Sequence, residues 1–89
     1  MAGAQLPLAP KEFALLALLL EHAGTVVTRR QLLEQVWGID YVGDSKTLDT
    51  HIKRIRAKIE ADPINPVRLV TVRGVGFRFE RRETDSLGG

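Results

Sequence analysis

Apolar residues recur at the spacing of an α-helix in three segments of this chain. The pattern predicts helices over residues 10–23, 28–37 and 45–60. Pro10 suits a first helical position, because the N–H that proline lacks would have no partner there. Gly24 suits the position after the last turn of the same helix.

The sequence caps the starts of these helices unequally. Thr28 and Gln31 form a capping-box pattern, in which each side chain serves the backbone of the other. Asp44 or Ser45 is expected to cap the third helix. Ala9 stands at the cap position of the first helix and has no oxygen to offer, which costs about 1 kcal/mol relative to Ser, Thr or Asp.

Residues rich in valine, phenylalanine and threonine follow the helices, over 67–73 and 77–81. They flank the sequence GVG, and this arrangement predicts a β-hairpin. Gly74 and Gly76 can both take the positive φ that a tight reversal requires. The order of elements predicts a single, mainly α domain of three helices with a C-terminal β-hairpin.

The first predicted helix is apolar on nearly every side. A helix on a protein surface normally carries only a stripe of apolar residues. This helix is therefore expected to need packing partners on two sides. Its large apolar residues are Phe13, Leu15, Leu16, Leu18, Leu19 and Leu20.

The third predicted helix is divided into an apolar stripe and a cationic face. At ~100° per residue, Leu48, Ile52, Ile55 and Ile59 lie within roughly 60° of one another. The opposite side carries Lys46, Thr50, Lys53 and Ala57, flanked by Thr47 and Arg54. A solvated face usually mixes charges in pairs, and only Asp49 and Lys53 supply such a pair here. Two interpretations stay open: a solvated surface, or a face that enters the major groove of DNA.

Basic residues gather in the second half of the chain. Residues 44–82 contain ten basic and five acidic residues, whereas residues 1–43 contain three basic and four acidic ones. Arginines along a hairpin can simply discourage pairing with another sheet. A cationic helix followed by a cationic hairpin, after two scaffold helices, indicates instead a winged helix-turn-helix that binds nucleic acid. The hairpin arginines are Arg68, Arg73, Arg78, Arg81 and Arg82.

Several classes of protein are excluded or disfavoured. The chain has no cysteine, so disulfides and zinc–thiolate sites are excluded. The longest apolar run, residues 13–20, is far shorter than the ~20 residues that cross a bilayer, which predicts a soluble, cytoplasmic protein. His22 and His51 lie on separate helices without a paired nucleophile, and RGVGF lacks the third glycine of a dinucleotide loop. We expect no enzyme, no cofactor and no metal.

Three motifs together resemble the effector domain of the OmpR/PhoB family of two-component response regulators. They are RRQLLEQVWG, KTLDTHIKRIRAKIE and TVRGVGFRF, in this order, and the similarity covers residues 8–80. The resemblance implies a bacterial transcription regulator with a winged-helix DNA-binding domain over residues 8–82. Residues 1–7 would be a remnant of an N-terminal sheet or a leader, and residues 83–89 a flexible tail.

The resemblance also implies roles for individual residues. The third helix would enter the major groove and the hairpin, as the wing, would lie at the adjacent minor groove. Thr50 and Arg54 are expected to contact base edges, and Thr47, Lys53 and Arg56 to contact phosphates. The remaining DNA-binding candidates are Lys46, His51, Trp37, Arg29, Thr71 and Arg73. For His51 and Trp37, packing in the core is an alternative to, or combines with, a contact to DNA.

Partners follow from the resemblance as well. The loop Ile39, Asp40, Tyr41, Val42 and Gly43 matches the segment that contacts RNA polymerase in family activators. The expected partners are promoter DNA with direct repeats, RNA polymerase, a second copy on DNA, and a receiver domain elsewhere in a longer chain. The chain departs from the family at Ala9, at Phe77 in place of a common tyrosine, and in the sheet that would precede residue 8. A winged helix that binds protein rather than DNA is the alternative function.

Overall fold

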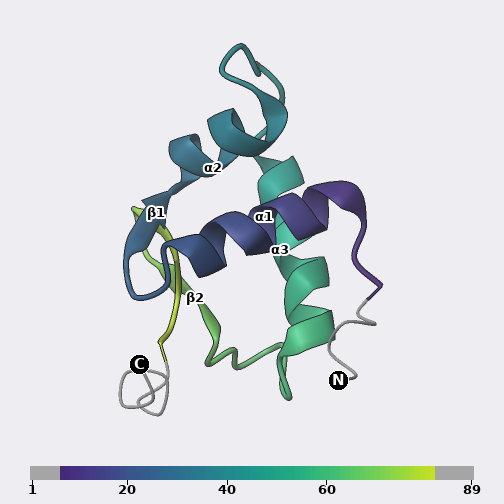
Figure 1. The fold of residues 1–89 in the computed structure, drawn as a ribbon, viewed down its shortest axis with the longest axis vertical. Coiled ribbons are helices and arrows are strands. Elements are labelled where there is room, and N and C mark those ends of the chain that lie inside the picture. The colour runs from purple at the N-terminus through teal and green to yellow at the C-terminus, as the bar shows by residue number, and fades with distance from the viewer. Residues whose placement is uncertain (1–6, 82–89) are drawn as a thin grey trace.

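The structure is a computed structural model and describes residues 7–81. Its elements are α1 (Pro10–Glu21), β1 (Val26–Thr28), α2 (Arg29–Trp37), α3 (Lys46–Ile59), β2 (Leu69–Val72) and β3 (Gly76–Phe79). The predicted three helices and C-terminal hairpin are confirmed, and each helix ends within two residues of its predicted bounds (Figure 1). The predictions for residues 1–6 and 83–89 lie outside the described residues.

Strand β1 was not predicted from the sequence. It pairs antiparallel with β3, and β2 pairs with the other edge of β3, so the sheet has the order β1-β3-β2. A strand of three residues is too short to show an alternating pattern, and its partner lies about fifty residues further along the chain. The hairpin is therefore the larger part of a three-stranded sheet.

The prediction for Gly76 was wrong, whereas that for Gly74 is confirmed. Gly74 has a φ of +76° in the turn between β2 and β3. Gly76 lies inside β3, opposite Thr28 and Val72, with φ outside the positive region. A Cβ atom there would collide with the backbone of Val27. This glycine is needed for close approach of two strands and not for a reversal.

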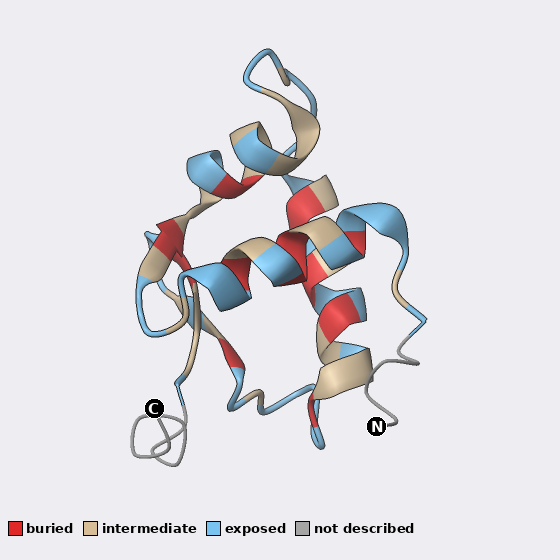
Figure 2. Cartoon of the chain, in the orientation of Figure 1, coloured by how far each residue is buried: buried red, intermediate tan, exposed pale blue. Residues whose placement is uncertain are grey.

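The core lies between the facing sides of α1 and α3 and extends to α2 and the sheet (Figure 2). Three residues of the predicted stripe of α3, Leu48, Ile52 and Ile55, are almost fully buried, and Ile59 is partly buried. On the far side of α1, Phe13 and Leu20 are 62% and 49% exposed. Within residues 7–81, α1 thus has packing partners on only one of its apolar sides.

The predicted capping box of α2 is present. The Gln31 N–H donates to Thr28 Oγ1 over 3.1 Å, and the Thr28 N–H donates to Gln31 Oε1 over 2.9 Å. At α3 it is Asp44 that caps, because its Oδ1 accepts the Lys46 N–H over 2.8 Å while Ser45 makes no side-chain cap.

The start of α1 lacks a capping oxygen, as Ala9 predicted. Glu12 compensates in part, because its Oε1 accepts the Ala9 N–H over 3.1 Å. The same oxygen accepts a hydrogen bond from Lys58 Nζ over 2.6 Å, and Glu12 is only 3% exposed. This buried ion pair joins the first turn of α1 to the last turn of α3. None of the helices within residues 7–81 is long and apolar enough to cross a bilayer.

Candidate nucleic-acid interface

The outer face of α3 is a row of exposed side chains with unpaired positive charge. The residues that point outward are Lys46, Asp49, Thr50, Lys53, Arg54 and Ala57, and all of them are exposed. Among residues 7–81, no ion pair involves Lys46, Lys53 or Arg54. The Thr50 hydroxyl donates a hydrogen bond to the Lys46 carbonyl one turn earlier, over 3.1 Å. Because the side chain of Ala57 is small, another surface can approach the helix backbone closely at this position.

Asp49 does not pair with Lys53, contrary to the expectation from their spacing. Arg29 at the start of α2 holds it instead, with distances of 2.7 Å and 3.1 Å to the two carboxylate oxygens. The same guanidinium donates to the Ser45 carbonyl over 3.2 Å. The hydrogen bond to Asp49 raises the pKa of Arg29. The one acidic side chain on the outer face is thereby neutralised from behind, and Lys53 keeps its charge free.

Arg56 bridges the helix and the sheet. Its Nε donates to the Leu69 carbonyl and its terminal nitrogen to Thr71 Oγ1, both over 2.9 Å. The guanidiniums of Arg56 and Arg29 each lie 5.8 Å from the centre of the Phe77 ring. Burial lowers the pKa of Arg56, against the nearby carboxylates of Glu60 and Asp49. The predicted phosphate roles of Arg29 and Arg56 thus concern side chains that already have partners in the fold.

Glu60, for which no role was predicted from the sequence, fixes the end of α3 to the start of β2. Its carboxylate accepts the backbone N–H groups of Val67, Arg68 and Leu69 over 2.7–3.0 Å. Burial alone would raise the pKa of Glu60, but these three hydrogen bonds outweigh it and lower the pKa below its ordinary value. Helical spacing cannot reveal such a contact, because all three partners lie beyond the helix, two of them before β2 and one at its first residue.

The wing presents one arginine at its tip. Arg73 is exposed in the turn that the Val75 N–H closes onto the Val72 carbonyl over 2.9 Å. Arg78 is bound to Glu80 over 2.7 Å, whereas Arg68 and Arg81 are exposed at the base of the hairpin. Arg82 lies outside the described residues. The backbone carbonyl of Val75 also accepts the Arg29 N–H over 3.3 Å, which ties the turn to α2.

His51 and Trp37 pack against each other. Their rings meet edge to face with centres 5.0 Å apart, and both side chains are partly buried. His51 Nδ1 lies 2.7 Å from the Thr47 carbonyl. These contacts support the packing alternative for both residues, and their predicted contacts to DNA stay predictions.

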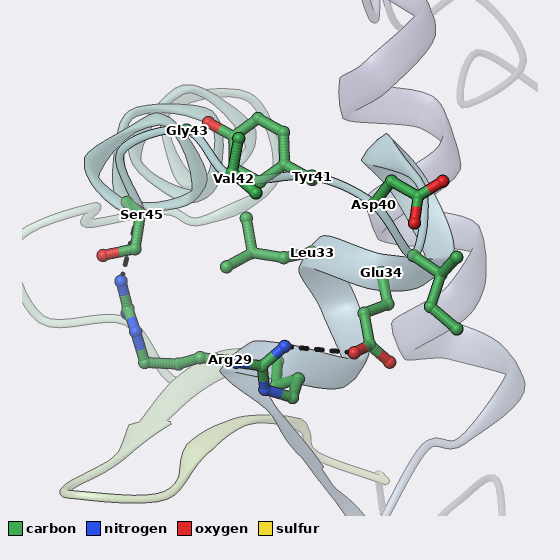
Figure 3. Close-up of a pocket in the computed structure, with 10 residues that line it drawn as sticks. Arg29, Leu33, Glu34, Asp40, Tyr41, Val42, Gly43 and Ser45 are labelled. Carbon is green, nitrogen blue, oxygen red and sulfur yellow. Dashed lines mark hydrogen bonds and ion pairs between the residues drawn. The ribbon is translucent and has the colours of Figure 1, made fainter.

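The loop between α2 and α3 exposes large apolar side chains to solvent. Val42 and Ile39 are 95% and 77% exposed. The Tyr41 hydroxyl donates to the Asp44 carbonyl over 2.9 Å and its ring covers Gly43, so the loop has a defined shape. Loop and α2 enclose a pocket of about 620 Å³, into which Leu33, Tyr41 and Val42 point (Figure 3).

Comparison with known proteins identifies this arrangement. The family described as "Transcriptional regulatory protein, C terminal" matches residues 3–79. The chain belongs to this family. It is a C-terminal DNA-binding domain of the OmpR/PhoB response-regulator type, as its three motifs predicted, and the family's members are transcription regulators rather than enzymes.

Two curated relatives illustrate the similarity. The sensory transduction protein RegX3 of Mycobacterium leprae is 60% identical over 78 residues, which are 88% of this chain and 39% of RegX3. The alkaline phosphatase synthesis transcriptional regulatory protein SphR of Synechococcus elongatus is 58% identical over 75 residues, which are 84% of this chain and 29% of SphR. The chain thus spans about a third of the length of these relatives.

Two solved structures share the fold. The response regulator DrrB of Thermotoga maritima, an OmpR/PhoB homologue, is 46% identical with a TM-score of 0.76, over 83% of this chain and 33% of DrrB. The RstA DNA-binding domain of Klebsiella pneumoniae, solved in complex with the RstA box, is 33% identical with a TM-score of 0.75. This second match covers 84% of this chain and 74% of the RstA domain.

Proposed function

We propose that this domain binds double-stranded DNA sequence-specifically, as the effector domain of a two-component response regulator in the bacterial cytoplasm. The carrying observation is the row of exposed, unpaired cations on α3, with Arg73 exposed on the wing beside it. In this proposal α3 enters the major groove and the wing lies at the adjacent minor groove. The RstA domain, which has the same fold, has been solved with its DNA box.

The exposed residues divide into two roles. Thr50 and Arg54 stand near the middle of the outer face and are assigned to base edges. Lys46 and Lys53 are assigned to phosphates, which position the helix without selecting a sequence. Thr47 is partly buried at the border of this face and is assigned to the DNA phosphate backbone.

Further partners are part of the same proposal. Full-length regulators of this type would place two copies on direct repeats of a promoter, brought together by a receiver domain. The exposed loop Ile39–Gly43 would then contact RNA polymerase. Its support is the defined loop shape and the exposure of Ile39 and Val42.

Selection from a pool of random duplex DNA at two salt concentrations tests the binding function. We expect an enriched motif, and binding that weakens steeply as salt rises, because phosphate contacts release counterions. Arg54→Ala should lose the enrichment, while Arg30→Ala, a change of an arginine held by Glu34 at 3.1 Å, should keep it. Salt-sensitive binding without an enriched motif would contradict sequence-specific recognition.

Protein binding is a second candidate, favoured by the apolar loop at Ile39 and Val42 and the pocket beside it. An apolar contact should resist salt where a phosphate contact does not. A folded domain that binds no duplex at low salt would favour this second function.

A further inference from the structure

Arg56 lies where α3 meets the wing, and both of its hydrogen bonds end on strand β2. One goes to the backbone at Leu69 and the other to the side chain of Thr71, two residues along the same strand. Because a guanidinium is planar, two bonds from one fork fix the strand in position and in rotation. One turn later, directly after the last residue of α3, Glu60 holds the backbone N–H groups of Val67, Arg68 and Leu69, which precede and begin β2.

The same side chain also determines how Thr71 faces solvent. A threonine hydroxyl has one hydrogen to donate and lone pairs that accept. Arg56 occupies a lone pair of Thr71 Oγ1, so the hydroxyl hydrogen is left to donate elsewhere, and Thr71 is exposed. An exposed hydroxyl held in this way is suited to donate to a phosphate oxygen.

Lys53 and Arg54 differ from Arg56 in their exposure and in their internal partners. Both are exposed and, among residues 7–81, free of ion pairs, whereas Arg56 is partly buried against the Phe77 ring. Moving Arg56 onto a phosphate would leave the Leu69 carbonyl and Thr71 without their donor. The arrangement favours a residue that works through the wing over one that clamps DNA.

We propose that Arg56 is a positioning residue for DNA binding. It holds strand β2 against α3, and so sets where Arg73 and Thr71 stand relative to the outer face of the helix. This inference rests on the proposed function, in which the wing contacts DNA. It assigns Arg56 a role through Arg73 and Thr71 in place of the direct phosphate contact expected from the sequence.

A double-mutant cycle between Arg56 and Arg73 tests the proposal on the selected duplex. Arg56→Ala alone should weaken binding roughly tenfold, as should Arg73→Ala. In the Arg73→Ala background, Arg56→Ala should weaken binding by clearly less than tenfold, because only Thr71 is then left on the wing for Arg56 to position. Lys53→Ala is the control. Its fold loss of affinity should be the same with and without Arg73→Ala, because in the proposed complex Lys53 contacts the DNA independently of the wing.

Arg56→Lys separates the two roles and is also the variant that disturbs the fold least. A lysine can clamp a phosphate as a point charge, but it cannot donate to Leu69 and Thr71 in one fixed fork. We expect Arg56→Lys to bind as weakly as Arg56→Ala, with the melting temperature of the free domain confirming that each variant is folded.

Three results would overturn the positioning role. Wild-type affinity in Arg56→Lys, or equal losses from Arg56→Ala with and without Arg73, would make Arg56 a phosphate clamp. An Arg73→Ala variant that binds like the wild type would mean that there is no wing contact to position. Wild-type protein that binds no duplex at all would instead refute the proposed function itself. The affinity of the wild-type protein, measured before any variant, separates this outcome from the other three.

Discussion

Gly74 and Gly76 lie two residues apart in the wing but are glycines for different physical reasons. Gly74 has a positive φ, and a Cβ added there would meet no other atom. A side chain at this position would therefore strain the backbone conformation but would clash with nothing. Gly76 has an ordinary φ, but a Cβ would strike the backbone of β1. The first position limits backbone conformation and the second limits volume.

These two glycines should respond differently to substitution. Gly74→Asn should cost at most about 1 kcal/mol, because asparagine tolerates the left-handed region. Gly76→Ala should cost about 3 kcal/mol or more, because neither strand backbone can move aside without breaking the sheet. Urea unfolding of both variants measures the difference. Equal losses of stability would contradict the close packing of β1 on β3.

The candidate site could be predicted for residues that face solvent and only in part for those that face the protein. Helical spacing placed Lys46, Lys53 and Arg54 on the exposed side of α3, because a wheel depends on sequence distance alone. The partners of Arg29 lie 16 and 20 residues away and those of Arg56 lie 13 and 15 residues away, and only the packed fold brings them together. The family resemblance implied contacts to DNA for these two arginines, but it did not reveal their hydrogen bonds within the protein.

Helix α1 illustrates how far an element could be predicted. Its bounds, its missing cap and its all-round apolar character followed from Pro10, Ala9 and six large apolar residues. Strand β1 could not be predicted, since its three residues pair with β3, which lies about fifty residues further along the chain. Short strands of this kind depend on tertiary structure and leave no pattern of their own.

A capping residue at Ala9 should stabilise α1. Ala9 already has the extended backbone of an N-cap, with φ −69° and ψ 158°, so Ala9→Ser needs no rearrangement. We expect a gain of about 1 kcal/mol in the free energy of unfolding. Ala17→Ser, the same change at an exposed position inside the helix, should instead lose about 0.5 kcal/mol. A gain of equal size at both positions would show that capping is not its cause.

Two buried carboxylates connect the elements of the whole molecule and make its stability depend on pH. The hydrogen bond from Lys58, with that from the Ala9 backbone, lowers the pKa of Glu12 despite its burial. Burial raises the pKa of Glu60, but its three backbone hydrogen bonds reverse the effect. Both pKa values lie below the ordinary 4.5 in the folded chain. Their contribution is therefore complete above that pH and is lost as the pH falls through the folded values.

Urea unfolding at about pH 7 and about pH 3 measures this dependence. The wild-type domain should be less stable at the lower pH. Glu60→Gln should be destabilised at pH 7 and should lose less on acidification than the wild type. Glu21→Gln, a change of an exposed carboxylate on α1, is the matched control for net charge. If Glu60→Gln and wild type lost the same stability between the two pH values, the carboxylate would not hold β2.

In the proposed complex, DNA lies on the outer face of α3 and on the wing tip. An NMR titration of the isotopically labelled domain with its selected duplex locates the bound surface. We predict that amide signals shift chiefly at exposed positions of Lys46–Ile59 and at residues 73–75, and that high salt reverses the shifts. Shifts confined to the loop Ile39–Gly43 or to the exposed side of α1 around Phe13, with α3 unchanged, would contradict the account.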